Sequence, residues 1–521
     1  MFLLLTLLAC SDKASDTGAA GGGDSITVGA QSLVVTATDS GTLHAAWSCA
    51  SDGALTVTSA AGDQRDLEPG SSADGCLRTL TVSAPPGSDV TFALTGDGGS
   101  ASLKKTAPAL PDGIYQVGDG LTLSGDWVDD GAFVIGYDFL GEQDEPGWGV
   151  GALVVLDADG GHLAHVVSAP ESRLSHKSGL LLDGALYHIN YSKEFDADSM
   201  QGNSVTVLPL SGRHDADEAV ELATPQGHHF LDLSAEGELL YLDIERVCDF
   251  EGSGDALAHD RLMSLPVSGG ASELLYDTLD DWIGELVARN GLQATLADAM
   301  GNYTNYDCGG DSQRVRDVGH VNGVDCVGDT CILSAIGSIH TLLLVDRSTG
   351  ALLHDLATFD ADWPDGLGTH HDVQFISDDR VLIFENGIPE NGATPVMYEL
   401  DVDAGTIAEI WAPRRRTDCI QAAAMGWVTG VDGDDLEGTL AAWNPSSGDP
   451  GVRVLMSYGT GGVYTLEDGG GDRLGRLTFD LNDGSTSECD VSTRAAVAAG
   501  QIQHVSEATL AADFPDWIRL K

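Results

Sequence analysis

The segment LLLVDRSTGALL at residues 342–353 decides the fold, because it holds one complete repeating unit of the chain. Two apolar runs flank a stretch rich in turn-forming residues, which predicts a β-hairpin. The same unit recurs at LVVLDADGGHLAHVV (153–167) and at VMYELDVDAGTIAEIW (396–411). Hairpins that recur at such intervals are best closed into a ring, because radial closure hides most sheet edges. We therefore predict a β-propeller over residues 108–521, with six blades expected and seven or eight also compatible with the pattern.

A different unit precedes the hairpin repeat. Residues 25–107 contain short apolar runs separated by Gly, Asp and Ser, which is typical of a small antiparallel β-sandwich. The segment TAPALPDG (106–113), with two prolines, is expected to be the linker. Inside the repeat, DTLDDWIGELVA (277–288) has its apolar residues at helical spacing and predicts a short helical insertion between blades. The expected fold class is thus all-β.

The first ten residues, MFLLLTLLAC, are apolar but shorter than the roughly 20 residues needed to cross a bilayer. They are typical of an export signal. The run LLAC (7–10) resembles the bacterial lipobox, so Cys10 is the expected lipidation site, and an ordinary secretory signal is the alternative. Residues 11–24 are small and polar and predict a flexible tether. We expect an exported protein, periplasmic or at the cell surface, held to the outer membrane only by this lipid.

Eight cysteines remain after Cys10, an even number in a chain predicted to be exported. Structural disulfides are expected in such a compartment. Local spacing pairs them as Cys49–Cys76, Cys248–Cys308, Cys326–Cys331 and Cys419–Cys489. A zinc site is the alternative, and the absence of any CxxC pair argues against it.

The charge is strongly negative: 25 basic and 81 acidic residues give −56. Such a surface repels nucleic acid and anionic lipid, so neither is an expected partner. The segments DVDAG (401–405) and DLNDG (480–484) resemble calcium loops, but neither has the full ligand pattern of an EF-hand. Hairpin turns explain both segments, and no metal or cofactor is predicted.

Three histidines stand at equivalent places in the hairpin repeat. His229 lies in GHHFLDLSAEG (227–237), His320 in DVGHVNG (317–323) and His371 in GTHHDVQF (368–375). Each is expected to open the innermost strand of a blade. Since those strands line the central channel of a propeller, the three side chains should converge near one rim although they are far apart in sequence. The alternative is that they are polar residues that satisfy strand ends.

These segments carry a resemblance to a family. The run HVNGVD (320–325), followed by the hairpin at 342–353, resembles the His-Val-Asn-Ser segment of bacterial periplasmic arylsulfotransferases. HHDVQFISDDRVLIFENG (370–387) resembles the Gln-His-Asp-Ala segment of that family and its Phe-Asp-Asn-Gly turn, and the run beginning at His228 is similar to an earlier His-His-Asp motif. The likeness covers roughly residues 110–470, and the sandwich before it matches the domain order of the family.

The resemblance implies a chemistry and roles. In the family, a channel histidine takes the sulfuryl group from an aryl sulfate as a sulfohistidine and passes it to a phenol without a nucleotide donor. Carried over, His371 is the nucleophile, while His229 and His320 bind sulfate oxygens and assist proton transfer. His370 and Asn322 are expected to contact the substrate. Neutral imidazole is a competent nucleophile near pH 7.

The match has one gap. The family has a Ser-Ser-Arg run where this chain reads SAIG (334–337), so Ile336 replaces the arginine. Arg414, Arg415 and Arg416 could supply the missing charge, and a solvated basic turn is their alternative interpretation. The sequence therefore leaves open a second class, a non-catalytic surface propeller that binds a ligand or a protein. A quinone-dependent dehydrogenase is a third, for which the Trp-containing docking repeats are not visible.

Overall fold

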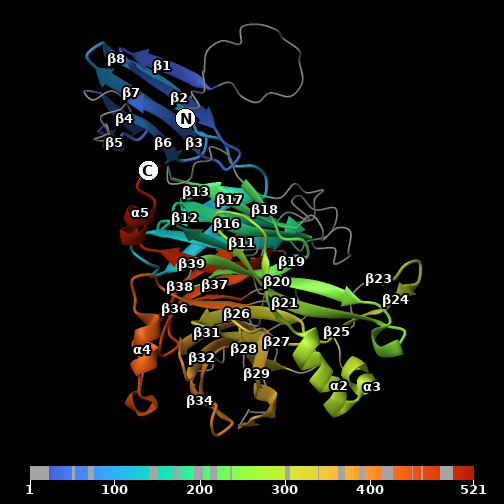
Figure 1. Ribbon diagram of the computed structural model, residues 1–521. Coiled ribbons are helices and arrows are strands. Elements are labelled where there is room, and N and C mark those ends of the chain that lie inside the picture. Colours follow the sequence, from blue (N-terminus) through green and yellow to red (C-terminus); the bar gives the residue numbers. More distant parts are fainter. Residues whose placement is uncertain are drawn as a thin grey trace.

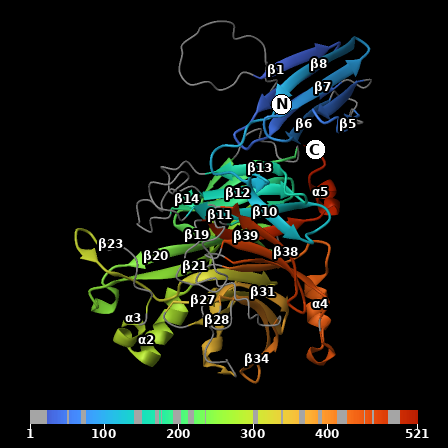
Figure 2. The same cartoon turned by 180° about the vertical axis from the view of Figure 1, so that it is seen from behind.

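The structure is a computed structural model of the whole chain. It describes residues 23–49, 53–68, 76–139, 151–167, 174–175, 178–192, 203–211, 220–234, 237–297, 299, 306–337, 340–361, 370–386, 393–412, 426–448, 450–458, 462–480 and 497–521. These residues are mainly β-structure in many small sheets (Figures 1 and 2). Within them, no helix combines the length and the apolar character needed to span a membrane.

Two sheets form the N-terminal part, drawn in blue in Figure 1. Alternating burial along strands such as β4 (Ala54–Ser59) directs every second side chain inward. Leu33, Trp47 and Phe92 are fully buried in the core that the two sheets share. The strands of the first sheet are β1 (Asp24–Val28), β2 (Gln31–Ala37), β3 (Leu43–Cys49), β6 (Cys76–Ser83) and β40 (Trp517–Arg519). Those of the second sheet are β5 (Gln64–Leu67), β4 (Ala54–Ser59), β7 (Asp89–Gly96) and β8 (Gly99–Thr106).

The C-terminal strand β40 ties the two parts of the molecule together. It pairs with β6 in parallel, so residues predicted to belong to the propeller complete an N-terminal sheet instead. Trp517 packs with an apolar cluster that includes Val134 and Leu153, whereas Ile518 packs into the N-terminal core. The Trp517 indole donates to Ser83 Oγ (2.9 Å), and that hydroxyl donates to Leu163 O (2.6 Å). A pairing this distant in sequence carries no local signal.

The remaining large sheets are mainly antiparallel, with a parallel pair in three of them, and give the rest of the chain a propeller-like fold. In chain order, the first three contain β11 (Ala132–Phe139), β12 (Gly151–Asp157), β13 (His162–Val167) and β39 (Val497–Val505); β14 (Leu174–Ser175), β15 (Gly179–Leu182), β16 (Ala185–Ser192), β17 (Ser204–Pro209) and β18 (Val220–Ala223); and β19 (Gly227–Leu233), β20 (Glu238–Val247), β21 (Ala256–Pro266), β22 (Glu273–Asp277) and β25 (Val315–Asp317).

The next three contain β26 (Val321–Val327), β27 (Thr330–Ala335), β28 (Thr341–Asp346) and β29 (Ala351–Asp355); β30 (Asp360–Ala361), β31 (His370–Ser377), β32 (Arg380–Glu385), β33 (Thr394–Asp401) and β34 (Thr406–Trp411); and β35 (Trp427–Gly430), β36 (Arg453–Ser457), β37 (Val463–Asp468), β38 (Arg473–Phe479), β10 (Gly120–Gly125) and β9 (Gln116–Val117). The predicted hairpins 153–167, 342–353 and 396–411 are confirmed as β12–β13, β28–β29 and β33–β34.

One strand from each of these six sheets takes part in a cyclic series of contacts. We call β39, β15, β19, β26, β31 and β35 the ring strands, because each approaches the next in this order and β35 returns to β39. Two strands also join opposite ends of the sequence: β39 pairs with β11, and β10 pairs with β38. These pairings close the ring.

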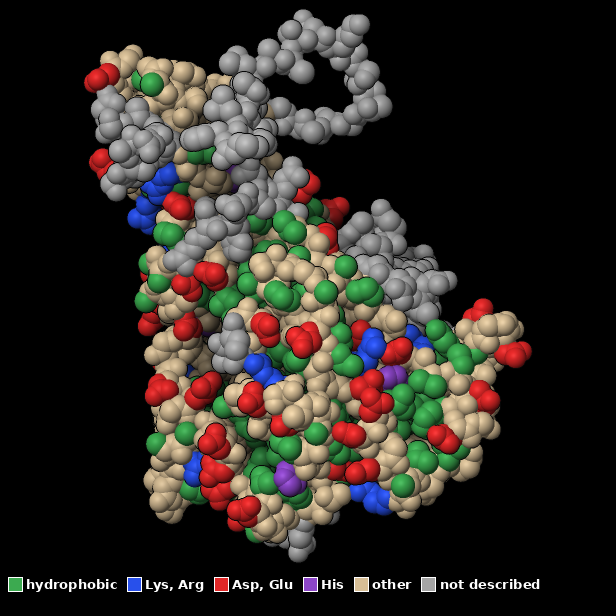
Figure 3. Space-filling view, viewed as in Figure 1, with side chains coloured by type: hydrophobic (Ala, Val, Ile, Leu, Met, Phe, Trp, Pro, Cys, Tyr) green, Lys and Arg blue, Asp and Glu red, His purple; other side chains and the backbone are tan. Residues whose placement is uncertain are grey.

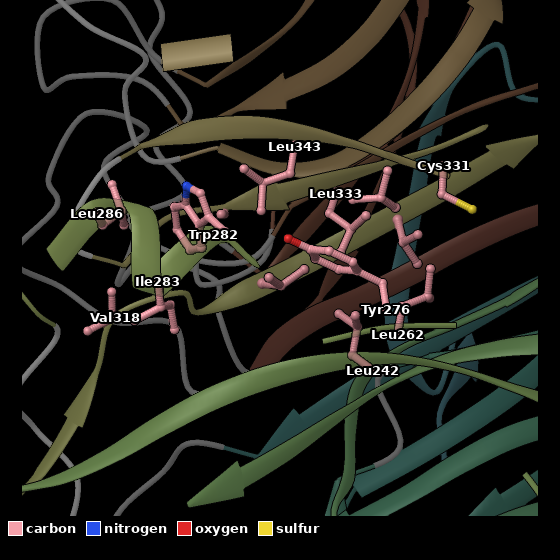
Figure 4. Packing of buried hydrophobic residues seen from close by; sticks show 14 of the residues in the cluster. Leu242, Leu262, Tyr276, Trp282, Ile283, Leu286, Val318, Cys331, Leu333 and Leu343 are labelled. Atoms are coloured by element: carbon pink, nitrogen blue, oxygen red, sulfur yellow. The ribbon is translucent and has the colours of Figure 1, made fainter. Parts of the chain in front are cut away.

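The predicted helical insertion is confirmed between β22 and β26. It consists of a π-helical turn, η3 (Leu279–Ile283), and the helices α2 (Gly284–Asn290) and α3 (Leu292–Ala297). Figure 4 shows Trp282, Ile283 and Leu286 in the core between the β19–β22 and β26–β29 sheets. The Trp282 indole donates to Asp355 Oδ2 at 3.2 Å. The insertion therefore packs two neighbouring sheets together. Shorter helical segments are η2 (Phe250–Gly252), η4 (Leu356–Thr358), α4 (Leu436–Ala442), η5 (Pro445–Ser447) and α5 (Glu507–Asp513).

Two of the four predicted disulfides are confirmed. Cys326–Cys331 crosses the β26–β27 hairpin, and Cys248–Cys308 joins the end of β20 to the short β23–β24 hairpin (Tyr306–Asp307 and Ser312–Gln313). Cys49 and Cys76 face each other in the β3–β6 register, but their side chains are outside the described residues. Cys419, Cys489 and Cys10 also lie outside them.

Candidate functional site

The histidines singled out from the sequence lie at the beginnings of three consecutive ring strands. His229 is the third residue of β19, His320 directly precedes β26, and His371 is the second residue of β31. Strands β26 and β31 run side by side in the same direction, since Asn322 Nδ2 donates to His370 O (2.9 Å) and Phe375 N donates to Asp325 Oδ2 (2.6 Å). The fold thus places His320 and His371 on adjacent strands at the same end of the ring.

His371 is buried and held in one orientation. Its Nδ1 lies 3.1 Å from Asn386 Oδ1, and an amide oxygen can only accept, so Nδ1 carries the proton. In a neutral imidazole the other nitrogen, Nε2, then carries the lone pair. The register of β31 against β32 shifts between His371 and Val373, and Asp372 between them has φ +56°. Asp is among the few residues that tolerate this left-handed conformation.

His320 is held by carboxylates. It adopts φ +43°, and its backbone N and its Nδ1 both donate to Asp317, at 2.9 and 2.7 Å. Burial lowers the pKa of His320, but the negative charges of Asp317 and Asp260 outweigh burial and leave the pKa above its usual value. His320 therefore favours the imidazolium form more than an ordinary histidine does.

Asp260 joins the beginnings of β19 and β26. Its Oδ2 accepts from Val321 N at 3.0 Å, and its Oδ1 lies 3.3 Å from His228 Nε2. His228 and Asp260 are both buried. His228, the first of two adjacent histidines in β19, therefore lies beside Asp260, a carboxylate that also acts on His320. The side chain of His229 lies outside the described residues.

His370 and Asn322 connect neighbouring sheets. The ring of His370 is fully buried, and its Nε2 donates to Thr341 O at 3.2 Å. Asn322 accepts from Ser334 Oγ (2.8 Å) and donates to the backbone of His370. Both residues thus position the backbone that carries His371.

Ile336 lies close to His320 but faces the core. Its side chain is only 4% exposed, and its backbone N donates to His320 O at 3.3 Å. The position that carries arginine in the resembling family therefore presents neither charge nor a side-chain donor here. Arg414, Arg415 and Arg416 lie outside the described residues.

Farther along the same three strands the structure places carboxyl groups that the sequence analysis missed. They are Asp232 on β19, Asp325 on β26 and Asp372 on β31. Burial, reinforced by the charge of Asp325, raises the pKa of Asp232 to about 8 and that of Asp372 to about 7. Burial also raises the pKa of Asp325. Asp232 is the sixth residue of β19, Asp325 the fifth of β26 and Asp372 the third of β31, so no common register pointed to them.

Sequence reasoning also missed Asn386, Asp317 and Asp260, the partners of the histidines. Asp317 stands three residues before His320, and Asn386 belongs to the FENG turn (384–387) quoted for the resemblance, so both had a local signal. Asp260 had none, because only the tertiary fold brings it to β26.

A cavity of about 450 Å³ is lined by the last residues of β15, β35 and β39 and by the middle of β31. Its lining includes Gln374, Asp432, Glu437, Gln503 and His504. The histidines stand at the beginnings of the ring strands, so the cavity is not their site. Acidic side chains also predominate among the charged groups over the face in Figure 3. Among the described residues, no three His, Cys, Asp or Glu side chains are grouped so that they could hold a metal ion.

No family model matches the chain, and no curated protein matches it in sequence. Solved structures with distant likeness include a protein of unknown function from Bacteroides thetaiotaomicron VPI-5482, with TM-score 0.31, 10% identity, and coverage of 89% of this chain and 88% of that one. A quinonprotein alcohol dehydrogenase-like protein from the same organism has TM-score 0.32 and 10% identity, covering 89% and 94% of the two chains. The C-terminal WD40 domain of Sif2 has TM-score 0.25 and 11% identity, covering 58% and 62%.

Proposed function

We propose that the chain consists of an N-terminal β-sandwich and a six-bladed β-propeller, and that the propeller transfers a sulfuryl group from an aryl sulfate to a phenol through His371. The cyclic contacts of the six ring strands support the blade count. The shared core of the two N-terminal sheets supports the sandwich. The single observation that carries the chemistry is the bond from His371 Nδ1 to Asn386, since it puts the proton on Nδ1 and the nucleophilic lone pair on Nε2.

The first half-reaction starts with neutral His371 and protonated His320. Nε2 of His371 attacks sulfur, the N–S bond forms, and the S–O bond to the aryl group breaks with its electron pair on oxygen. His320 gives its proton to that oxygen, so a neutral phenol leaves. In the second half-reaction, His320 takes the proton of the acceptor phenol, whose oxygen attacks sulfur while the N–S bond breaks. Both histidines return to their starting states.

His320 also supplies the positive charge that an arginine provides in the resembling family. The pKa of His320 is raised by Asp317 and Asp260 against the effect of burial, so it favours a cation beside the sulfate. A fixed charge or donor near developing negative charge typically contributes about 100-fold to 1,000-fold in rate. We therefore assign to His320 both the charge at the sulfate and the proton for the leaving phenol.

The place of the protein in the cell follows the same proposal. We propose an exported lipoprotein anchored through Cys10 and facing an oxidising compartment. The disulfides Cys248–Cys308 and Cys326–Cys331 support this, because such bonds persist where thiols are not kept reduced. Its substrates are small aryl sulfates and phenols.

The test is steady-state transfer from 4-nitrophenyl sulfate to phenol by the full chain. We expect turnover by the native protein and none by His371→Gln. The matched control is His354→Gln, a half-buried histidine on β29 whose ring contacts Phe359. Equal rates for native protein and His371→Gln would overturn the proposal. A native protein that binds 4-nitrophenyl sulfate without turning it over would favour the non-catalytic propeller instead.

A further inference from the structure

Asn386 directly follows β32, and only one of its two amide atoms has a hydrogen-bond partner among the residues that the structure describes. Its side chain is only 1% exposed. Oδ1 accepts from His371 Nδ1, while Nδ2 is buried and has no hydrogen-bond partner among the residues that the structure describes. Buried donors without partners are rare in native proteins, and each calls for a ligand, a water or a functional role. Here the donor belongs to the residue that orients the proposed nucleophile.

We propose that Asn386 is a positioning residue that fixes the proton of His371 on Nδ1, so that Nε2 carries the lone pair. The nucleophilic role of His371 rests on the proposed function, whereas the tautomer of its ring is tested independently of that function. With the amide in the opposite orientation, Nδ2 would donate to Nδ1, and Nε2 would carry the proton and be unable to attack.

An amide suits this place better than a carboxylate. A neutral partner fixes the tautomer and brings no negative charge that would favour the imidazolium. A carboxylate at the same distance would favour the imidazolium, because an opposite charge within 4–6 Å typically shifts a pKa by about 1–3 units. His320 has such a partner in Asp317, at 2.7 Å. The neutral amide beside His371 therefore suits a nucleophile, and the carboxylate beside His320 suits a proton donor.

The experiment uses full-length protein labelled with ¹⁵N in its histidine rings, and long-range proton–nitrogen spectra that report the tautomer and charge of each ring. The signal of His371 is the one lost in His371→Gln. We expect the native ring to be neutral at pH 7.5 with its proton on Nδ1. Asn386→Leu should lose this preference, and Asn386→Asp should keep the ring charged to a pH about 1–3 units higher.

Asn190→Leu is the matched control, since Asn190 is also buried but bonds to Thr206 on the β16–β17 hairpin. It should leave the His371 signal unchanged. A native His371 with its proton on Nε2, or a signal that neither Asn386 variant alters in folded protein, would overturn the proposal. Because Leu could disturb folding, Asn386→Asp provides the second reading.

The expected tautomer together with no sulfuryl transfer would uphold the positioning of His371 and refute the proposed function.

Discussion

The ring strands β19, β26 and β31 carry histidines at their beginnings and carboxyl groups farther along. At the beginnings, Asp317 and Asp260 outweigh burial and raise the pKa of His320. Farther along, burial raises the pKa of Asp232 and that of Asp372, and no positive charge among the described residues opposes either change. The same strands thus favour a protonated base at one level and protonated acids at the next. What differs is whether each buried group has an opposite charge beside it.

The largest expected effect comes from removing the partner of His320. Asp317→Asn takes away the nearest carboxylate, so burial dominates and the pKa of His320 falls. Sulfuryl transfer at pH 7.5 should drop about 100-fold, the lower end of what a positioned acid contributes. The pH–rate profile should lose its high-pH limb at a lower pH than in the native protein.

The control for Asp317→Asn is Asp378→Asn, an exposed carboxylate in the turn between β31 and β32. It should leave the profile unchanged. If Asp317→Asn lowers the rate equally at every pH, the residue supports the backbone at His320 and does not set the charge of the ring.

A second, smaller effect is expected on thermal stability, through the buried carboxyl group of Asp232. The pKa of Asp232 is raised above its unfolded value, so its protonated form stabilises the fold below pH 4, and this contribution is lost as the pH rises towards about 8. Asp232→Asn keeps a neutral side chain at every pH. It should therefore raise the melting temperature at pH 9 relative to native protein by roughly 2–4 °C, and change it little at pH 5.

Thermal unfolding followed by circular dichroism at both pH values makes the comparison. The exposed variant Asp378→Asn should show no such difference. An Asp232→Asn protein that is less stable than the native chain at pH 9 would mean that the carboxylate form is the one the fold needs.

The smallest effect is expected at the edge of the cavity. Burial raises the pKa of Asp325, and the negative charge of the exposed Glu437 raises it further. Glu437→Gln should lower the pKa of Asp325 slightly, and the change should shrink in high salt because exposed charges are screened. Carbon-13 spectra of labelled aspartates would follow it. A shift of Asp325 that is insensitive to salt would show that the variant alters packing.

Local patterns predicted more of this molecule than its long-range pairings. The β28–β29 hairpin follows from its Asp/Gly turn, and the insertion at 277–288 follows from the spacing of Trp282, Ile283 and Leu286. The pairing of β40 with β6 depends on contacts across more than 400 residues and has no local signal. At the site, the residue types and strand positions of His320 and His371 were readable, while their partners Asp260 and Asn386 were not recognised.

The measurement that tests the central claim most directly is the mass of the His371 peptide after brief mixing of native protein with 4-nitrophenyl sulfate and no acceptor. The reaction is stopped at alkaline pH, because N-sulfo bonds to imidazole break in acid. We predict the added mass of one SO₃ group on His371, which disappears when phenol is added and never forms in His371→Gln. The same added mass on another residue, or none on a protein that releases nitrophenol, would contradict the account.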